Sequence, residues 1–486
     1  MSSDPDRTPA ARAGRDMTTG SIPRHLVAFA LPMLAGSALQ TAYSFVNAFW
    51  VGKRLGAGAL AAVTVSQPVI FVTIAAAAGL TLATNILIAQ YYGARDWDRL
   101  KRVVQTSAVF ATAVGLVLLA LGLTFARELL LLINTPGDVF AASLGYLRIV
   151  LWTLPLTFWL FLIGAMLRGI GDSRTPVYFQ TVSVLLNTVL DPILMFGWLG
   201  FPRLGLNGTA WATIFSQAAA VVALMLYVPK RRPLVMPQLR PRRMDLQTTW
   251  LLIEIGFPSM VQQSVVSVSM LVIVSLVSRF GSLTDAAFGA GLRIDSVAFM
   301  PAITIGLAVS TLAGQNLGAG KLERVREVFR WGLLLSGGIS LVIAVLAASF
   351  PTYCLRIFIN DPGVLAIGVG YLHIIAATYV IYAVMFISHG IINGAGHTVV
   401  TTLISMIALW GIRLPLAALL SRHHDGPTGI WYAMLISVFC GMAMSLSVYL
   451  SGFWKRPVVK LRLFGNRNQR GEVSSSPPPN HLSSSP

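Results

Sequence analysis

The sequence contains few charged residues: 11% of its 486 residues are Asp, Glu, Lys or Arg, whereas 55% are hydrophobic. A soluble chain carries about 25% charged residues, so this chain lacks the polar surface that water requires. Its two cysteines, Cys354 and Cys440, are isolated. A disulfide framework and a CxxC metal site are therefore excluded. The low charge also excludes most soluble enzymes, disordered proteins and coiled coils, and it indicates a membrane protein.

Motifs for nucleotide chemistry and secretion are also missing. The glycine-rich stretch at 168–173, RGIGDS, lacks the GxxxxGK[ST] pattern of a phosphate-binding loop. Residues 1–22 are polar and have no apolar core beside a cleavage site, so we expect no signal peptide. A membrane enzyme would need His, Asp and Glu clustered at one membrane face, and the loops offer only scattered candidates. We predict that the chain is not an enzyme and needs no cofactor beyond a coupling ion.

Long apolar stretches fill most of the chain. A helix needs about 20 apolar residues to cross the hydrocarbon layer, and twelve stretches approach or exceed that length. They lie at about 24–50, 60–91, 103–125, 144–166, 177–198, 208–228, 251–278, 286–313, 329–350, 367–391, 399–420 and 428–452. The fold class that follows is an all-α integral membrane protein with twelve transmembrane helices, whose binding partner is the lipid bilayer.

The formal net charge of +18 is explained by the position of the basic residues. With the N-terminus placed in the cytoplasm, 26 of the 36 Lys and Arg lie in cytoplasmic segments and seven in outer loops. This bias predicts a multi-pass protein of the bacterial inner membrane with both termini in the cytoplasm. Because the same bias accounts for the positive charge, no nucleic-acid partner is expected.

The second half of the sequence repeats motifs of the first half at a constant offset. AQYYGA at 89–94 matches GQNLGA at 314–319, and YLRIV at 146–150 matches YLHII at 371–375. Each half holds an even number of spans, so both halves begin on the same side of the membrane. This predicts two six-helix bundles related by a pseudo-two-fold axis along the membrane normal, with a cavity between them. Two such bundles suit alternating access.

The repeat and the changes in composition divide the chain into five segments. The predicted order is a cytoplasmic N-tail at 1–22, an N-terminal bundle at 23–228, a basic linker at 229–244, a C-terminal bundle at 245–452, and a basic, Ser/Pro-rich tail at 453–486. We expect the chain to act as a monomer.

One acidic residue stands deep in an apolar stretch. Asp191 lies in LLNTVLDPILMFG, with Asn187 one turn earlier on the same face and Pro192 beside it. Asn47, Tyr43 and Thr209 fall at a similar depth in neighbouring spans. These residues predict a polar pocket in the outer half of the first bundle, in which a buried carboxylate exchanges a proton or amide and hydroxyl oxygens bind Na⁺. The alternative is a hydrogen bond that closes the break at Pro192.

The motifs of the two halves resemble a known family. FWVGKRLGAGALAAV at 49–63, the two Q-x-x-GA elements and LRGIGDSRTP at 167–176 are similar to those of the multidrug and toxic compound extrusion (MATE) family. RIDSVAFMP at 293–301 resembles its DNA-damage-inducible protein F-like subgroup. The resemblance spans about residues 20–452 and implies a secondary antiporter that exports organic, cationic and amphipathic compounds or drugs in exchange for H⁺ or Na⁺.

The resemblance also implies ion-coupling residues and shows where this chain departs from the family. Members of the archaeal type use an Asn, an Asp and a Thr like Asn187, Asp191 and Thr209, and their first helix bends at a proline like Pro32. They carry a further Asp in the first helix, where this chain has Asn47. The acidic site of the NorM-like branch is replaced by Gln263 and Tyr382. Coupling is therefore expected to rest on Asp191, with Pro32 and Pro192 as helix-bending residues.

The substrate surface is predicted from aromatic, Met and polar residues at membrane depth. The candidates are Arg293, Asp295, Gln263, Met260, Met300, Phe45 and Phe158. Arg293 and Asp295 are two residues apart, so they point to different helix faces and are either cavity residues or structural hydrogen-bonding groups. A flippase for lipid-linked saccharides is the alternative function, although it would need a strongly cationic cavity.

Overall fold

The computed structural model describes residues 14–50, 55–133, 135–237, 245–423 and 426–459, and these residues form helices joined by short connections. The helices of the first half are α1 (Ile22–Trp50), α2 (Ala57–Gly93), α3 (Trp97–Thr124), α4 (Ala126–Leu132), α5 (Gly137–Leu151), α6 (Thr153–Gly169), α7 (Arg174–Phe196) and α8 (Leu206–Arg231). Two 3₁₀ turns, η3 (Trp198–Gly200) and η4 (Pro233–Val235), flank α8. The described residues contain no strand.

The second half follows the same order. Its helices are α9 (Leu246–Ser278), α10 (Ser282–Gly318), α11 (Leu322–Ser349), α12 (Pro351–Arg356), α13 (Pro362–Gly394), α14 (Thr398–Met406), the π-helix η5 (Ile407–Arg413), α15 (Leu414–His423), α16 (Thr428–Leu450) and the turn η6 (Phe453–Lys455). The two ends of α10 follow those of α2 by the same offset that separates the repeated motifs, and the same is true of α11 and α3. The offset found in the sequence is therefore a repeat of helices.

The membrane-spanning helices agree with the prediction in number. Eleven described helices are long and apolar enough to cross a membrane, and the bent pair α5 and α6 makes a twelfth span. The predicted fourth span at 144–166 is therefore not one helix, because its two parts meet at 41° around Trp152. Pro155, in the first turn of α6, has no N–H to continue the hydrogen-bond ladder across this break.

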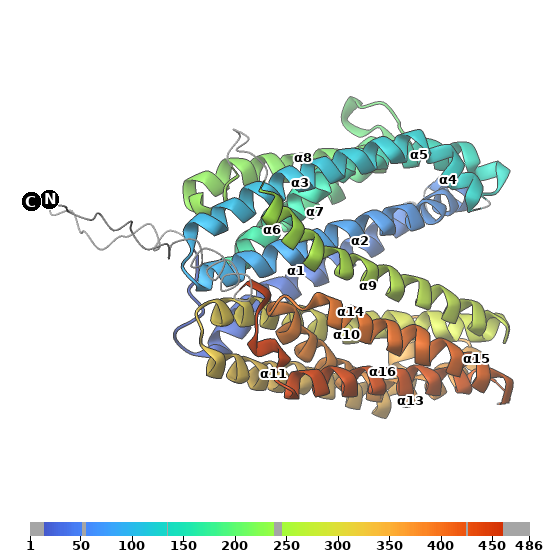
Figure 1. Ribbon diagram of the computed structural model, residues 1–486. Helices are drawn as coiled ribbons and strands as arrows, with labels where there is room; N and C mark the ends of the chain where they lie inside the picture. The colour runs from blue at the N-terminus through green and yellow to red at the C-terminus, as the bar shows by residue number, and fades with distance from the viewer. Residues whose placement is uncertain (1–13, 51–54, 134, 238–244, 424–425, 460–486) are drawn as a thin grey trace, which may run out of the picture.

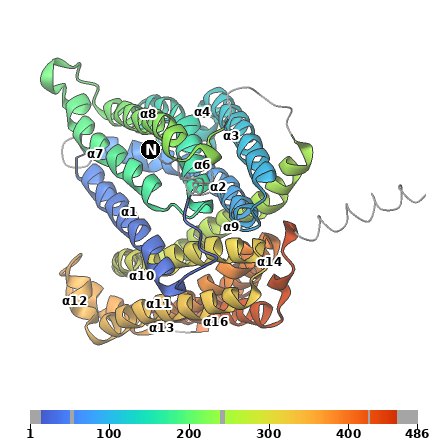
Figure 2. The same ribbon diagram turned by 90° about the vertical axis from the view of Figure 1, so that its left-hand side faces the viewer.

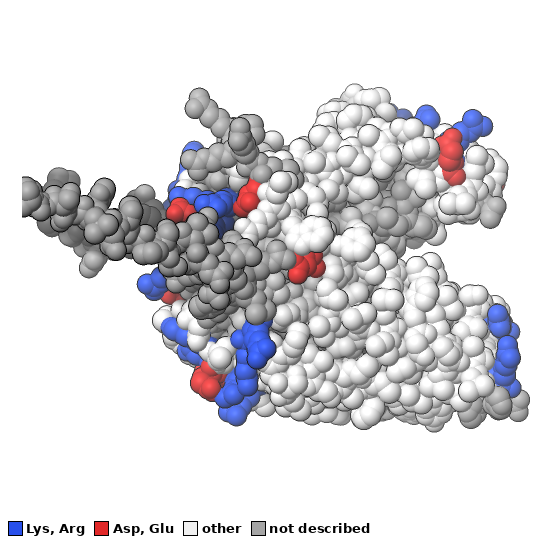
Figure 3. Space-filling view, in the orientation of Figure 1, with Lys and Arg blue, Asp and Glu red and all other residues white. Residues whose placement is uncertain are grey.

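The two halves form a V. Figure 1 shows most of α1–α8 above α10–α16, with the two groups of helices close together at the end where α1 begins (left) and separated toward the opposite end (right). The space-filling view is hollowed between the halves at that opposite end (Figure 3). We call the end at which the halves meet the closed end and the other the open end. The helices α1 and α9 lie at the boundary, where α1 contacts α10 and α11 and α9 contacts α2 and α3 (Figure 2).

Packing separates the core from a lipid-facing surface. Each half has its own buried cluster, one centred on α2, α3 and α6 and the other on α10, α13 and α16. A third cluster joins Ile22 and Leu26 of α1 to Ile305 and Leu317 of α10 at the closed end. Large apolar side chains such as Leu271 remain two-thirds exposed. In a bilayer this surface faces acyl chains, which explains why it needs no polar cover.

Candidate functional site: two polar sites in opposite halves

The side chains predicted to form a polar pocket in the first half lie together near the open end. Asp191 lies five residues before the end of α7 and is 1% exposed. Its Oδ2 accepts a hydrogen bond from the Tyr43 hydroxyl of α1 at 3.4 Å. Its Oδ1 is buried without a hydrogen-bond partner among the described residues. Asp191 thus keeps one buried oxygen available for a further partner.

Asn187 ties this carboxylate to the neighbouring helices. Its Oδ1 accepts a hydrogen bond from the Tyr43 hydroxyl, while its Nδ2 donates to Thr213 Oγ1 at 3.2 Å and to Ser216 Oγ at 3.0 Å. Asn47, one turn after Tyr43, donates to the Tyr43 hydroxyl at 3.0 Å. The structure therefore brings Tyr43, Asn47, Asn187 and Asp191 into one network built from α1, α7 and α8.

Thr209 reaches the pocket indirectly. Its hydroxyl donates to the carbonyl of Leu206 at 2.9 Å within α8, and its side chain lies beside Tyr146 of α5. Tyr146 lies close enough to Asp191 to interact with its charge. Sequence reasoning missed Tyr146, Thr213 and Ser216 as members of this pocket. The repeated YLRIV element contains Tyr146 and was the one signal that could have found it.

The two prolines predicted to bend helices both lie inside continuous helices. Pro32 is within α1 and Pro192 is within α7, directly after Asp191. Each lacks the N–H that would bond the carbonyl four residues earlier, so Pro192 leaves the carbonyl of Thr188 without its usual helical partner. The bending role of both prolines stays a prediction.

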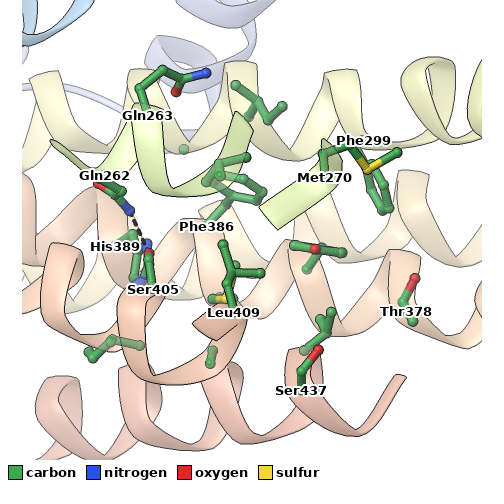
Figure 4. Close-up of a pocket in the computed structure, with 18 of the residues that line it drawn as sticks. Gln262, Gln263, Met270, Phe299, Thr378, Phe386, His389, Ser405, Leu409 and Ser437 are labelled. Atoms are coloured by element: carbon green, nitrogen blue, oxygen red, sulfur yellow. Dashed lines mark hydrogen bonds between the residues drawn. The ribbon is translucent and has the colours of Figure 1, made fainter. Parts of the chain in front are cut away.

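The second half contains a cavity of about 620 Å³ lined by α9, α10, α13, α14, η5 and α16, and Leu82 of α2 in the first half also borders it. Figure 4 shows Met270, Phe299, Phe386 and Leu409 beside the polar side chains of Gln262, Thr378, His389 and Ser437. The Gln262 amide donates to Ser405 Oγ at 2.7 Å across the cavity wall. This mixture of apolar surface with a few oriented polar groups is typical of a small-molecule site.

Asp295, one of the predicted substrate residues, lines this cavity, but both of its oxygens are held by tyrosines. Oδ1 accepts from Tyr379 at 2.7 Å, and Oδ2 accepts from Tyr371. Gln263, which is exposed, also lines the cavity. Asp295 therefore differs from Asp191, because no oxygen of Asp295 is without a partner.

The other predicted substrate residues lie elsewhere. Phe158 is 1% exposed and packs in the core of the first half, because α6 is buried between α2, α3 and α8. Arg293 is exposed, and its guanidinium lies 5.8 Å from the ring of Phe358. Met260 packs against Gly79, where α9 crosses α2. These three positions do not line the 620 Å³ cavity.

Two candidates remain. Met300 lines a second cavity of about 340 Å³, with Arg168 and residues of α1 and α7. This cavity lies between the two halves, since Met300 belongs to α10. The side chain of Phe45 falls outside the described residues.

The closed end is held by a reciprocal pair of hydrogen bonds. Gln90 of α2 donates to the carbonyl of Gly394 at 2.7 Å, and Gln315 of α10 donates to the carbonyl of Gly169 at 2.9 Å. The two donors are repeat equivalents, as are the two acceptors, so each half donates to the same place on the other. A Cβ at Gly93 would stand 1.9 Å from the Gln315 carbonyl oxygen. The two helix ends therefore touch through their backbones.

Residues 14–20, which we call the strap, cross the closed end from one half to the other. On the first half, the Arg15 N–H donates to the carbonyl of Ile170 at 2.9 Å. On the second half, Gln315 Oε1 accepts the Met17 N–H at 3.1 Å, and Lys321 and Arg324 donate to the carbonyls of Thr18 and Gly20. Met17 is fully buried.

One acidic residue of the strap is held in its charged form. Burial works to raise the pKa of Asp16, but hydrogen bonds from Thr18 and the charges of Arg95 and Lys321 outweigh burial and keep that pKa below its usual value. The carboxylate lies 3.8 Å from the guanidinium of Arg95. The strap thus adds an ion pair to its backbone contacts with the first half.

Comparisons with known proteins agree with this architecture. The MatE family profile matches residues 32–193 and 258–419. The probable multidrug resistance protein YoeA of Bacillus subtilis is 33% identical over 91% of this chain and 96% of its own length. The probable multidrug resistance protein NorM of Thermotoga maritima is 28% identical over 91% of this chain and 95% of its own.

Solved structures support the fold. A multidrug resistance MATE family transporter in an outward-facing conformation superposes with a TM-score of 0.84 at 22% identity, over 92% of this chain and 98% of the other. The family profile covers one stretch in each half, and the two stretches are spaced along the chain in step with the repeat. The chain described here belongs to the MatE family of membrane transporters.

Proposed function

We propose that this protein is a secondary antiporter of the bacterial inner membrane that exports organic compounds in exchange for H⁺ or Na⁺ by alternating access. The observation that carries the proposal is Asp191, a buried carboxylate with one unpartnered oxygen among the described residues. A carboxylate held this way in a membrane protein is costly. Binding a proton or Na⁺ at Oδ1 offsets that cost, and releasing it restores the charge.

The shape supports alternating access. Lys and Arg side chains gather at the closed end, and smaller groups stand at the tips of the open end (Figure 3). With that end in the cytoplasm, the V opens outward and the Asp191 pocket lies near its open end. Export then requires that the Gln90 and Gln315 bonds break so that the cytoplasmic side can open.

The substrate class proposed is an organic, cationic and amphipathic compound. The aromatic and Met residues around the 620 Å³ cavity support this class, because aromatic faces attract cations. Relatives such as YoeA and NorM carry multidrug resistance names. A flippase would need several cations, and Arg413 is the one Lys or Arg among the described residues that line this cavity. Pocket and cavity are each formed within one chain, which supports a monomer, and no organic cofactor is proposed.

Transport into everted membrane vesicles tests the proposal. Uptake of a fluorescent cationic dye is measured under an imposed H⁺ or Na⁺ gradient for the wild type, Asp191→Asn and the control Asp138→Asn, which removes an exposed acid from the first turn of α5. We expect Asp191→Asn to reduce uptake to the level of vesicles without the protein, while Asp138→Asn transports like the wild type. Gradient-driven uptake retained by Asp191→Asn would overturn the role of this carboxylate.

A further inference from the structure

Arg413 is a buried cation whose described partners are all neutral. It is 7% exposed, and its Nε donates to Ser437 Oγ at 2.8 Å while its Nη2 donates to the Tyr382 hydroxyl at 3.1 Å. Among the described residues, none of the ion pairs includes Arg413. The hydrogen bonds of Arg413 to described residues are made by Nε and Nη2, and none is made by Nη1. The guanidinium is therefore oriented by two neutral groups and keeps donors for a third.

The backbone directs this cation into the cavity. Arg413 is the last residue of η5, a π-helical turn inside the span from Thr398 to Arg422, and Pro415 follows two residues later. A π-helix is rare, and it shifts the direction of every following side chain relative to a regular helix. Arg413 and its partners Ser437 and Tyr382 all line the 620 Å³ cavity. The cation is thus part of the cavity wall.

A buried charge of this kind is costly unless something compensates it. An arginine at membrane depth costs about 2.5–3.5 kcal/mol on insertion scales, and two neutral hydroxyls do not cancel its charge. The acid in the same cavity, Asp295, is bound on both oxygens by Tyr371 and Tyr379. A ligand that brings its own acidic group to Nη1 would supply the missing counter-ion.

The rest of the cavity suits an aromatic, cationic body. The ring of Phe299 packs against that of Tyr382 at 4.5 Å, and Tyr382 stacks on Phe386 at 5.8 Å. All three line the cavity, and Tyr382 also touches Arg413. The aromatic surface and the guanidinium are therefore adjacent, so one small molecule can contact both.

We propose that the cavity of the second half selects zwitterionic amphipaths, whose acidic group binds Arg413 while their cationic aromatic body lies on Phe299, Tyr382 and Phe386. This inference rests on the proposed export function, because it names the substrate class of the same protein. A cavity of about 620 Å³ is within the 300–1,000 Å³ range of small-molecule sites. Arginine is suited to this role because its planar fork matches a carboxylate.

A matched pair of dyes tests the inference. Rhodamine 110 carries a free carboxylic acid, and rhodamine 123 is its methyl ester, so the two differ in the acidic group on the same ring system. Binding to the purified protein in nanodiscs is measured by fluorescence polarisation without any ion gradient. We expect the wild type to bind the free acid more tightly than the ester. Equal affinities for the two dyes would overturn the inference.

Variants at Arg413 test whether this residue causes the preference for the free acid over the ester. In Arg413→Gln, we expect the ratio of free-acid to ester affinity to fall about tenfold, since a charge-assisted hydrogen bond is lost. Arg413→Lys, which keeps the charge without the fork, should give an intermediate ratio. Arg293→Gln, which removes an exposed arginine outside this cavity, should keep the wild-type ratio. An equal loss of both dyes in Arg413→Gln would mean a purely structural role and would overturn the proposal.

The vesicle assay separates this inference from the proposed function. If the wild type transports neither dye under a gradient but binds the free acid through Arg413, the antiporter proposal fails and the site stands. If gradient-driven transport of the ester occurs and the Arg413 variants keep the wild-type ratio, the antiporter stands and the site fails.

Discussion

The two halves carry opposite charges on their fifth spans. The fifth span of the first half, α7, carries Asp191 and Asn187, and the fifth span of the second, from α14 to α15, carries Arg413. Asn187 donates to Ser216 of α8, and Arg413 donates to Ser437 of α16. The duplicated scaffold has therefore kept a hydrogen bond between its fifth and sixth spans while the charge on the fifth has reversed.

The equivalence of the two serines follows from local packing. Ser216 stands eight residues after Gly208, and Ser437 stands eight residues after Gly429. Both glycines pack closely on the preceding span, because a Cβ built on either one would lie 2.6 Å from a carbonyl oxygen of that span. The tyrosines Tyr146 and Tyr371 are likewise repeat equivalents, yet Tyr146 lies near Asp191 on the fifth span, whereas Tyr371 binds Asp295 on α10. Repeat symmetry therefore predicts where polar side chains lie in each half, but not which charged residue they contact.

The largest difference between the halves is expected in coupling. Asp295→Asn, assayed in everted vesicles beside Asp191→Asn, should keep gradient-driven uptake, because Asp295 has no unpartnered oxygen with which to exchange an ion. The stability of Asp295→Asn should fall by about 1–3 kcal/mol, since the amide nitrogen that replaces one carboxylate oxygen cannot accept the bond of its tyrosine. Thermal unfolding of the purified protein measures this loss. If Asp295→Asn also abolished gradient-driven uptake, the two acids would be equivalent in coupling and the proposed difference between the halves would be wrong.

The closed end, in contrast, should respond symmetrically. A methyl group at Gly93 or Gly318 would stand 1.9 or 2.0 Å from a carbonyl oxygen of the other half, so α2 and α10 must move apart. We expect Gly93→Ala and Gly318→Ala each to lower stability by roughly 1–3 kcal/mol. Gly337→Ala in α11, where nothing lies within 4 Å of the added atom, is the control and should be neutral or stabilising. If only one of these two variants lost much stability, the two halves would not contribute equally to the closed end.

The strap adds a smaller asymmetry at this end. Gln315 accepts the Met17 N–H in addition to its own bond to Gly169, while Gln90 Oε1 has no partner among the described residues. We expect Gln315→Ala to cost about 1 kcal/mol more than Gln90→Ala, because it also strands a buried N–H. Thermal shifts of the two variants measure the difference. Equal shifts would mean that the strap contact contributes nothing to stability.

The smallest expected effect comes from a second acid in the first half. Asn47→Asp places a carboxylate within reach of the Tyr43 hydroxyl, which Asn47 already contacts at 3.0 Å. Two carboxylates in one pocket titrate together, so we expect a shifted pH profile or an altered number of ions per substrate. Ion flux and dye uptake, recorded together in vesicles, measure this number. An unchanged profile and an unchanged ratio would place Asn47 outside the coupling path.

The sequence predicted the scaffold better than the sites. Apolar length predicts twelve spans, and the constant offset between the repeated motifs is reproduced in the helix ends. Asp191 and Asn187 could be paired because i and i+4 positions share a helix face. Tyr146 and Ser216 could not be placed, because their role depends on how separate helices pack. Arg413 could not be oriented either, because a π-helical turn changes helix phase without a clear sequence signal.

The break at Trp152 and the position of Phe158 also could not be predicted from the sequence, because both depend on how the helices pack. A hydropathy stretch does not distinguish a straight span from two helices meeting at 41°. An aromatic residue in an apolar span reads the same whether it faces a cavity or a core. Phe158 is in the core because α6 packs on three neighbours, and that is a property of the assembled half.

The strap has a consequence for how the molecule is made. Met17 binds Gln315, which is 298 residues later in the chain, so a ribosome releases the first partner long before it has produced the second. Chains fold from the N-terminus as they emerge, and Met17 cannot reach this partner until α10 has been inserted. The first described residues of the chain therefore dock late, only after the second half has delivered α10 to the membrane.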